Sequence, residues 1–347
     1  MRPRELTGLW TDLPLVGRGS PSPIRGWYLA LGPAGAFLGV CEPNAPPWIR
    51  HGHLDPTGAW EWSAAWTVPP RPDAPAGWAD EGISVDSVWI DIDRLDPMRL
   101  AINRTEYQGG SHGVVVGRWG EAFDEIESPT DSDIRFGQPL VLRGDELWSH
   151  DTNELWSFRR HGDTWHRAST VCAPNLPEGV TELGWAGEVS ADGGRVYLEA
   201  WSCVAVFERV TARRGEQDAF RWARTIPCHG RVAGLAQTRE GLVVVDHADD
   251  SGLRVGLYDR ELRTLSRKSV QESSTVTPVA IAGDRVVLHA RDVLLVLDLH
   301  TGAVTHHLML PPSLVVPRGR MLPGTMHVDG DRVVVATDEA LGVYVLT

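Results

Sequence analysis

Apolar residues along this chain are grouped into short runs rich in valine and leucine, and tight-turn residues separate the runs. The clearest stretch covers residues 278–310, where turn residues at 283–284, 290–292 and 301–302 divide four apolar runs. Runs bounded in this way by Gly and Asp are typical of antiparallel strands joined by hairpins. The stretch therefore predicts a four-stranded meander. One such sheet cannot bury both of its faces, so it needs further copies of itself.

The turn that precedes the second strand of this meander recurs through the chain. In five segments it falls at Asp145, Gly194, Gly241, Asp284 and Asp331, with spacings of 43 to 49 residues. A repeat in this range with four short strands is typical of a β-propeller blade. The pattern predicts four blades between about residues 130 and 310, and a last blade near residues 320–347.

Two further blades are expected upstream of this repeat. The expected strands of the first are 26–31, 36–41, 48–54 and 60–68, and those of the second are 83–92, 98–104, 113–119 and 122–127. A proline-rich insertion at residues 69–78 separates them. The count is then about seven blades, a common number for this architecture, in a single domain that covers residues 1–347.

The last blade contains only three expected strands, at residues 326–328, 333–337 and 342–346. The strand-like run at residues 6–13 has no other sheet to join. Because an unpaired sheet edge is a liability, we predict that residues 1–13 supply the outermost strand of the last blade, next to Gly342–Leu346, and close the ring.

The stretch from 284 to 302 also carries a resemblance to known repeats. Its residues read Asp284-Arg-Val-Val-Leu288 and then Leu294-Leu-Val-Leu-Asp-Leu-His-Thr-Gly302. This resembles quinoprotein-like and WD40/YVTN-like propeller repeats, in which a strand ending in Leu-Asp-x-x-Thr-Gly closes the third hairpin. The resemblance implies the propeller architecture. It does not imply quinone binding, because cofactor-docking motifs are absent, and the Gly-His and Trp-Asp pairs of typical WD40 blades do not recur.

Composition agrees with this fold class. The 347 residues include 36 glycines and 24 prolines, without a long run of helical periodicity, which favours an all-β, seven-bladed propeller rich in turns. The formal net charge of −13 would repel a phosphate backbone, so we expect no nucleic-acid partner. The four cysteines contain no Cys-x-x-Cys pair, so neither a zinc knuckle nor a disulfide framework is indicated.

The chain has no apolar segment long enough for a signal peptide or a membrane span. We therefore expect a monomer in the cytoplasm without a membrane partner. The sequence leaves the identity of any cofactor or metal open.

Candidate chemistry is expected at the mouth of the propeller channel. Loops between second and third strands, and loops between blades, open there, and ligand-binding groups usually come from such loops. The residues expected at this face are His150, Glu199, His247 and His289 at second-strand ends, with Asp249 and the linker residue His229 nearby. As one cluster they could act as acid–base groups or metal ligands. The alternative is that they only satisfy backbone groups at strand ends.

Tryptophan is unevenly distributed, since all 15 lie at or before Trp222. Large flat side chains pack well between twisted sheets, which is one explanation. The other is an aromatic pocket, for which Trp185 and Trp201 are the candidate ligand-binding residues. Arg291, two residues after His289, is a further candidate for ligand binding.

Two functions fit these observations. The first is a cytoplasmic scaffold that binds a protein partner or a ligand at the channel mouth. The alternative is a lyase, cyclase or hydrolase that uses the histidine and carboxylate cluster on a small molecule, with or without a metal. The sequence has no Gly-x-Ser-x-Gly elbow, P-loop, Gly-x-Gly-x-x-Gly after a strand or His-Glu-x-x-His helix that would favour an enzyme.

Overall fold

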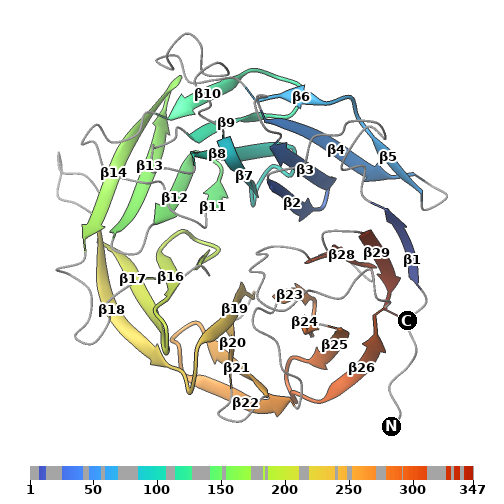
Figure 1. The fold of residues 1–347 in the computed structure, drawn as a ribbon. Helices are drawn as coiled ribbons and strands as arrows, with labels where there is room; N and C mark the ends of the chain where they lie inside the picture. The colour runs from blue at the N-terminus through green and yellow to red at the C-terminus, as the bar shows by residue number, and fades with distance from the viewer. Residues whose placement is uncertain are drawn as a thin grey trace. The chain divides into compact units, whose positions relative to one another are not determined.

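The structure is a computed structural model. It describes residues 8–12, 26–41, 47–55, 59–68, 85–106, 114–126, 141–150, 154–172, 183, 187–210, 219–238, 241–247, 252–270, 279–290, 292–310, 326–329, 332–336 and 340–346, and not every side chain within them. All regular structure in these ranges is β-strand, and the strands form seven sheets (Figure 1). The chain is a seven-bladed β-propeller. Within the same ranges, no helix could span a membrane.

Residue contacts divide the chain into two compact units, and residues Pro14–Thr170 form one of them. It contains three sheets. The first comprises β2 (Gly26–Gly32), β3 (Gly35–Cys41), β4 (Trp48–Leu54), β5 (Trp60–Trp62) and β6 (Trp66–Thr67), with both β5 and β6 paired to β4. The second comprises β7 (Val85–Ile92), β8 (Arg99–Glu106), β9 (Val114–Arg118) and β10 (Phe123–Ile126). The third comprises β11 (Val141–Arg143), β12 (Glu146–His150), β13 (Glu154–His161) and β14 (Thr164–Cys172).

The other unit joins Met1–Leu13 to Val171–Thr347 and contains four sheets. One comprises β15 (Gly187–Val189), β16 (Arg195–Glu199), β17 (Cys203–Val210) and β18 (Ala219–Pro227). The next comprises β19 (Val232–Gln237), β20 (Gly241–His247), β21 (Leu253–Asp259) and β22 (Thr264–Val270). The third comprises β23 (Val279–Ala282), β24 (Arg285–Ala290), β25 (Val293–Asp298) and β26 (Val304–Met309). The last comprises β27 (Met326–Asp329), β28 (Arg332–Ala336), β29 (Ala340–Val345) and β1 (Gly8–Asp12).

These sheets confirm the strand predictions. The meander predicted at residues 278–310 is the antiparallel sheet β23 to β26. The two upstream blades have strands that begin and end within a few residues of the predicted bounds, except that the one strand predicted at 60–68 is two short strands, β5 and β6. The insertion at 69–78 lies outside the described residues. The single domain over residues 1–347 stays a prediction.

The last sheet takes its outer strand from the other end of the chain. Strand β1 pairs antiparallel with β29, with Gly8 opposite Tyr344 and Asp12 opposite Ala340 (Figure 1). This is the pairing predicted from the three-strand count of the last blade. It places a backbone partner along an edge of β29 that would otherwise be open.

The core of this unit lies between neighbouring sheets. Strand β24 shows how one strand serves two layers, because successive side chains point to opposite faces of a sheet. Val286 and Leu288 pack with Val243 of the preceding sheet. Val287, one residue along, packs with Val333 and Val335 of the following sheet. Both faces of the sheet are therefore buried, which explains why its strands read as continuous apolar runs rather than alternating ones.

The Asp-x-x-Thr-Gly sequence forms the turn between β25 and β26. Asp298 Oδ1 accepts hydrogen bonds from the backbone N of Thr301 at 2.7 Å and from Thr301 Oγ1 at 2.7 Å. These bonds lower the pKa of the Asp298 carboxyl. Gly302 follows with φ of 65°, the left-handed region that favours glycine. The motif thus has a structural role, which is to build this turn.

Deleting residues 1–13 removes β1 and uncovers the edge of β29. We expect the thermal midpoint to fall by about 5 °C or more and the protein to aggregate, because an open edge pairs with other chains. Differential scanning fluorimetry and size-exclusion chromatography measure both effects. The control is deletion of residues 1–7, which keeps all five paired residues of β1. Equal midpoints and monomeric elution for both deletions would contradict this role of β1.

Candidate functional site

The structure places the predicted second-strand residues at strand ends. Glu199 is the last residue of β16, His247 the last of β20 and His150 the last of β12. The side chain of His150 and the residues Asp249, Trp185 and Arg291 lie outside what the structure describes. Glu199, His247 and His229 lie in the two adjacent sheets β15–β18 and β19–β22 or in the connection between them.

His289 differs from its prediction. It was expected at the channel mouth, but its exposed fraction is 0%. It lies inside β24, opposite Leu294 of β25, and the strand continues to Ala290. A substrate at the surface would not reach this imidazole.

The turn between β16 and β17 presents Trp201. Ala200 and Cys203 exchange backbone hydrogen bonds of 2.9 and 3.3 Å, which leaves Trp201 and Ser202 as the two central residues of the turn. Trp201 has φ of 58°. A positive φ at the first central position of a hairpin turn favours glycine, and a large residue there is strained. Trp201 is nevertheless 60% exposed.

The connection between the two sheets, residues 228–231, is bonded to this turn. The backbone N of Cys228 donates to the carbonyl of Ser202 at 2.9 Å. The backbone N of Val232 donates to the carbonyl of Trp201 at 3.1 Å. These bonds fix the turn against the next blade and help to offset its strain.

The side chain of Arg231 connects this turn to Glu199. Arg231 Nε donates to Glu199 Oε1 at 3.1 Å, and the guanidinium carbon lies 5.4 Å from the centre of the Trp201 ring. The Glu199 side chain is 4% exposed and the Arg231 side chain 31% exposed. A buried carboxylate thus anchors a guanidinium that stacks on an exposed indole. We call Trp201, His229 and Arg231, with Glu199 behind them, the Trp201 patch.

A second buried carboxylate, that of Asp246, accepts a hydrogen bond from the backbone of the connection. Asp246 Oδ2 accepts from the backbone N of His229 at 2.8 Å, and Asp246 Oδ1 accepts from Arg254 Nε at 2.9 Å. A second guanidinium nitrogen of Arg254 donates to Asp246 Oδ2. Burial raises the pKa of the Asp246 carboxyl to about 6, and Arg267 counteracts part of this rise. This ion pair fixes His229, and through it the start of the patch.

Sequence reasoning missed Asp246 and Arg254. It selected His247, the neighbour of Asp246, for its chemistry. The signal that could have found the pair is the position of Arg254 on β21, a strand whose residues from Leu253 to Tyr258 are all buried. A buried arginine needs an acceptor, and the hairpin register places Asp246 directly opposite.

Two thiols lie beside this network. Burial raises the pKa of Cys203, and burial together with the nearby Asp246 charge raises the pKa of Cys228 to about 12. Both thiols are protonated at neutral pH, so neither is set up as a nucleophile.

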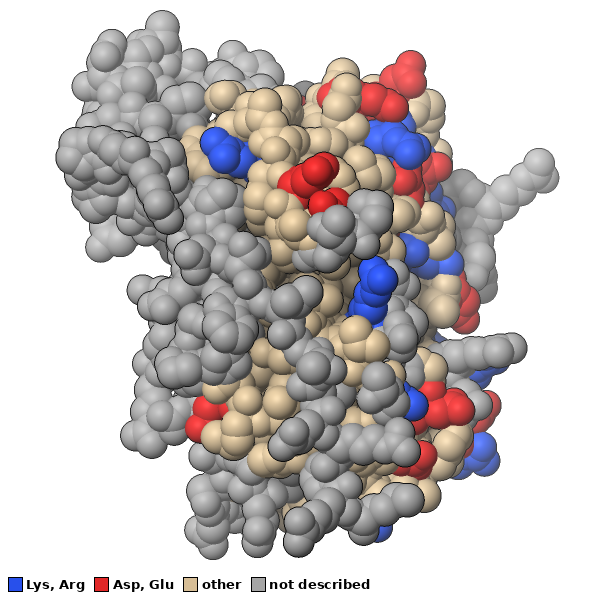
Figure 2. All heavy atoms as spheres, turned by 90° about the vertical axis from the view of Figure 1, so that its right-hand side faces the viewer, with Lys and Arg blue, Asp and Glu red and all other residues tan. Residues whose placement is uncertain are grey.

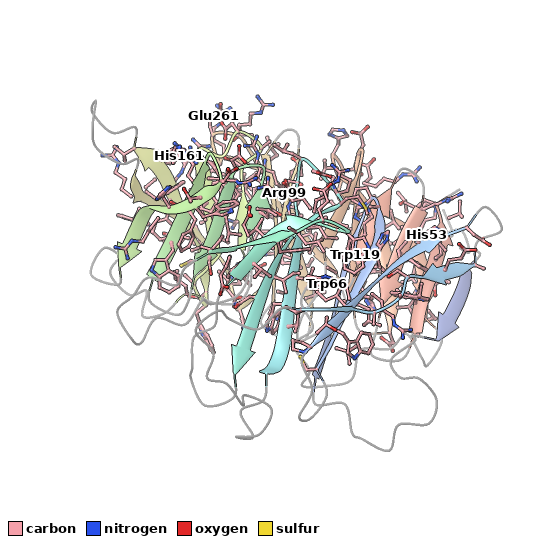
Figure 3. All side chains as sticks on the ribbon, turned by 90° about the horizontal axis from the view of Figure 1, so that it is seen from above. His53, Trp66, Arg99, Trp119, His161 and Glu261 are labelled. Carbon is pink, nitrogen blue, oxygen red and sulfur yellow. The ribbon has the colours of Figure 1, made fainter. Side chains whose placement is uncertain are left out.

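Tryptophans elsewhere support the packing explanation. Trp148 and Trp156 are buried in the sheet β11–β14. Trp66 stacks on Phe123 at 4.6 Å between ring centres and meets Trp119 edge-on at 6.0 Å (Figure 3). These rings fill the space between adjacent sheets. Trp201 differs from these rings, since it is 60% exposed, and Trp222 is exposed to a smaller extent.

Charge and metal chemistry add little elsewhere. Acidic and basic side chains are interspersed on the described part of the face in Figure 2, without a continuous basic stripe. Among the described side chains, no three His, Cys, Asp or Glu residues are grouped as metal ligands would be.

Comparison with solved structures gives WD40 β-propellers. Saccharomyces cerevisiae Sqt1 is similar with a TM-score of 0.59 and 10% identity, over 92% of this chain and 83% of that one. The β-propeller domain of Myceliophteria thermophila Cps50 (Swd1) has a TM-score of 0.56 and 12% identity, over 98% of this chain and 100% of that one. Chaetomium thermophilum Sqt1, solved bound to the N-terminus of the ribosomal protein L10, has a TM-score of 0.60 and 12% identity, over 92% and 83%.

No protein-family model matches the chain, and no curated protein matches its sequence. At such low identity the structural likeness shows the fold, and function has to be argued from the site.

Replacing Asp246 with Ala leaves Arg254 buried without its counter-ion. We expect the free energy of unfolding to fall by about 3–5 kcal/mol, measured by urea denaturation. The control is Glu61→Ala, which removes an exposed partner of His53 and should cost less than about 0.5 kcal/mol. A loss below about 1 kcal/mol for Asp246→Ala would contradict a structural role of the pair.

The raised pKa of Cys228 predicts slow alkylation. At pH 8 only a very small fraction of this thiol is ionised, so iodoacetamide should modify it at least about tenfold more slowly than free cysteine. Mass spectrometry of the Cys228 peptide, with urea-unfolded protein as the control, measures the rate. Equal rates in folded and unfolded protein would show that the thiol is not buried in solution.

Proposed function

We propose that this chain is a β-propeller that binds a protein partner through the Trp201 patch. The observation that carries the proposal is the exposed Trp201 side chain on a strained backbone, stacked against Arg231. Trp and Arg are the residue types most enriched among those that dominate binding energy in protein interfaces.

Folding alone does not account for Trp201 at this position. Glycine would adopt the positive φ without steric cost, and burial of the indole does not repay the strain because the side chain is largely exposed. Strain that persists at an exposed residue is a reason to propose function there. Removal of the indole from water by a partner would supply the missing gain.

The fold comparison supports this proposal. One similar propeller was solved with the N-terminus of another protein bound to it, so the architecture can hold a peptide segment. We further propose that the protein works as a monomer in the cytoplasm, as expected from the sequence.

The enzyme alternative has less support. Of the histidines expected at the mouth, His289 is buried in a strand. His229 is exposed within the patch and His247 is partly buried, but the described carboxylates of the site, Glu199 and Asp246, are paired with Arg231 and Arg254. The arrangement therefore serves to position groups for binding.

The substitution Trp201→Gly is expected to weaken partner binding without lowering the stability of the fold. Glycine relieves the backbone strain and removes the indole, so the free energy of unfolding should stay within about 1 kcal/mol of the original. Capture of partner proteins from a lysate of the source cells by the immobilised chain should fall at least tenfold, measured by quantitative mass spectrometry.

The control for this experiment is Trp222→Ala, which removes another exposed tryptophan from β18, the outer strand of the same sheet. It should capture the same proteins as the unmodified chain. Equal capture by the Trp201→Gly protein would show that the Trp201 patch does not bind the partner proteins.

A further inference from the structure

We propose that the Trp201 patch recognises an acidic segment of its partner, in which an Asp or Glu side chain lies next to a large apolar one. This inference rests on the proposed function and specifies the chemistry of the partner. Its observations are the positions and exposures of the charged groups around the connection 228–231.

Among the described side chains around this connection, the charged groups that face solvent are the guanidinium groups of Arg231 and Arg267, although the whole chain has a net charge of −13. The two carboxylates of the site, Glu199 and Asp246, have side-chain exposures of 4% and 3%. Arg231 is partly exposed, and Arg267 is exposed. An approaching segment therefore meets guanidinium groups, while the carboxylates lie behind them.

These guanidinium groups are held in position before any partner arrives. Glu199 and the Trp201 ring fix Arg231 at the end of the connection. Arg267 Nη2 donates to the Tyr258 hydroxyl at 2.8 Å and to the carbonyl of Pro227, at the start of the connection, at 3.4 Å. A positioned guanidinium loses little side-chain freedom when it binds a carboxylate, so it is a selective receptor for one.

His229 lies two residues before Arg231 in the connection and is exposed. Its backbone is fixed by Asp246. The guanidinium of Arg267 therefore lies at the start of the connection and that of Arg231 at its end, where it adjoins the indole of Trp201. An acceptor flanked by an apolar side chain matches this order of groups.

The probe is a random 12-residue peptide library, displayed on phage and selected on the immobilised full-length protein. Enriched sequences are then synthesised with blocked ends, so that only side-chain carboxylates remain, and their binding is measured by fluorescence anisotropy. We expect enriched peptides to contain more Asp and Glu than Lys and Arg, and at least one large apolar residue.

Arg231→Gln tests the charge directly. Glutamine can still donate a hydrogen bond to Glu199, but this buried carboxylate loses its counter-ion, so the thermal midpoint should fall. Binding is therefore measured at a temperature at which circular dichroism shows both proteins to be folded, and the selected peptides should bind the variant about tenfold more weakly. The matched control is Arg332→Gln, which removes the same charge from an exposed position on β28 and should change binding less than twofold. Raising the salt from 0.05 to 0.5 M should weaken binding to the original protein more than to Arg231→Gln.

The outcomes separate this inference from the proposed function. Neutral or basic peptides that lose binding on Trp201→Gly would overturn the acidic partner and leave the patch as a protein-binding surface. Peptides that bind Trp201→Gly as well as the original chain, or no enrichment, would overturn both. Displacement of the peptides by an oligothymidylate would point to phosphate instead of carboxylate recognition and would also overturn the inference.

Discussion

Each four-stranded sheet of this chain has two apolar faces, and both must be removed from water. In β24 the side chains of Val286 and Val287 enter different layers, although they are adjacent in sequence. Full burial of such a side chain stabilises the fold by about 1.5–3 kcal/mol, so a sheet without neighbours on both sides would lose much of its stability. The repeat of the sequence follows from this constraint, since each copy covers a face of the next.

The same constraint places the polar groups of the site. The apolar layer between the sheets β15–β18 and β19–β22 ends where their second strands end, and a connection must cross from one sheet to the next there. Glu199 and Asp246 lie at these ends, buried, and each is paired with an arginine. A buried carboxylate without such a partner would cost several kcal/mol, so the positions of Arg231 and Arg254 are fixed by the need to satisfy it.

Strand bounds could be predicted well because turn residues and apolar runs are local signals, and the pairing of β1 with β29 followed from counting strands. The site was predicted only in part. The aligned sequence repeat predicted Glu199 and His247 correctly as the last residues of their strands. It could not show that β24 continues past His289, because the residues on both sides of His289 are apolar and no turn residue marks the end of the strand there. Asp246 and Arg254 are eight residues apart and meet only through the hairpin register, so no local pattern marks them as a pair.

Stability and the proposed recognition make opposite demands at Trp201. The turn would be less strained with glycine, yet the connection donates two backbone hydrogen bonds to this turn, and Arg231 stacks on the indole. The bonds that offset the strain also set the position of the guanidinium, because both come from residues 228–232. The indole and the guanidinium are therefore ordered by the same contacts in the unbound protein. These two side chains would therefore lose less conformational entropy on binding a partner of the proposed kind than side chains on a flexible loop would, which favours affinity.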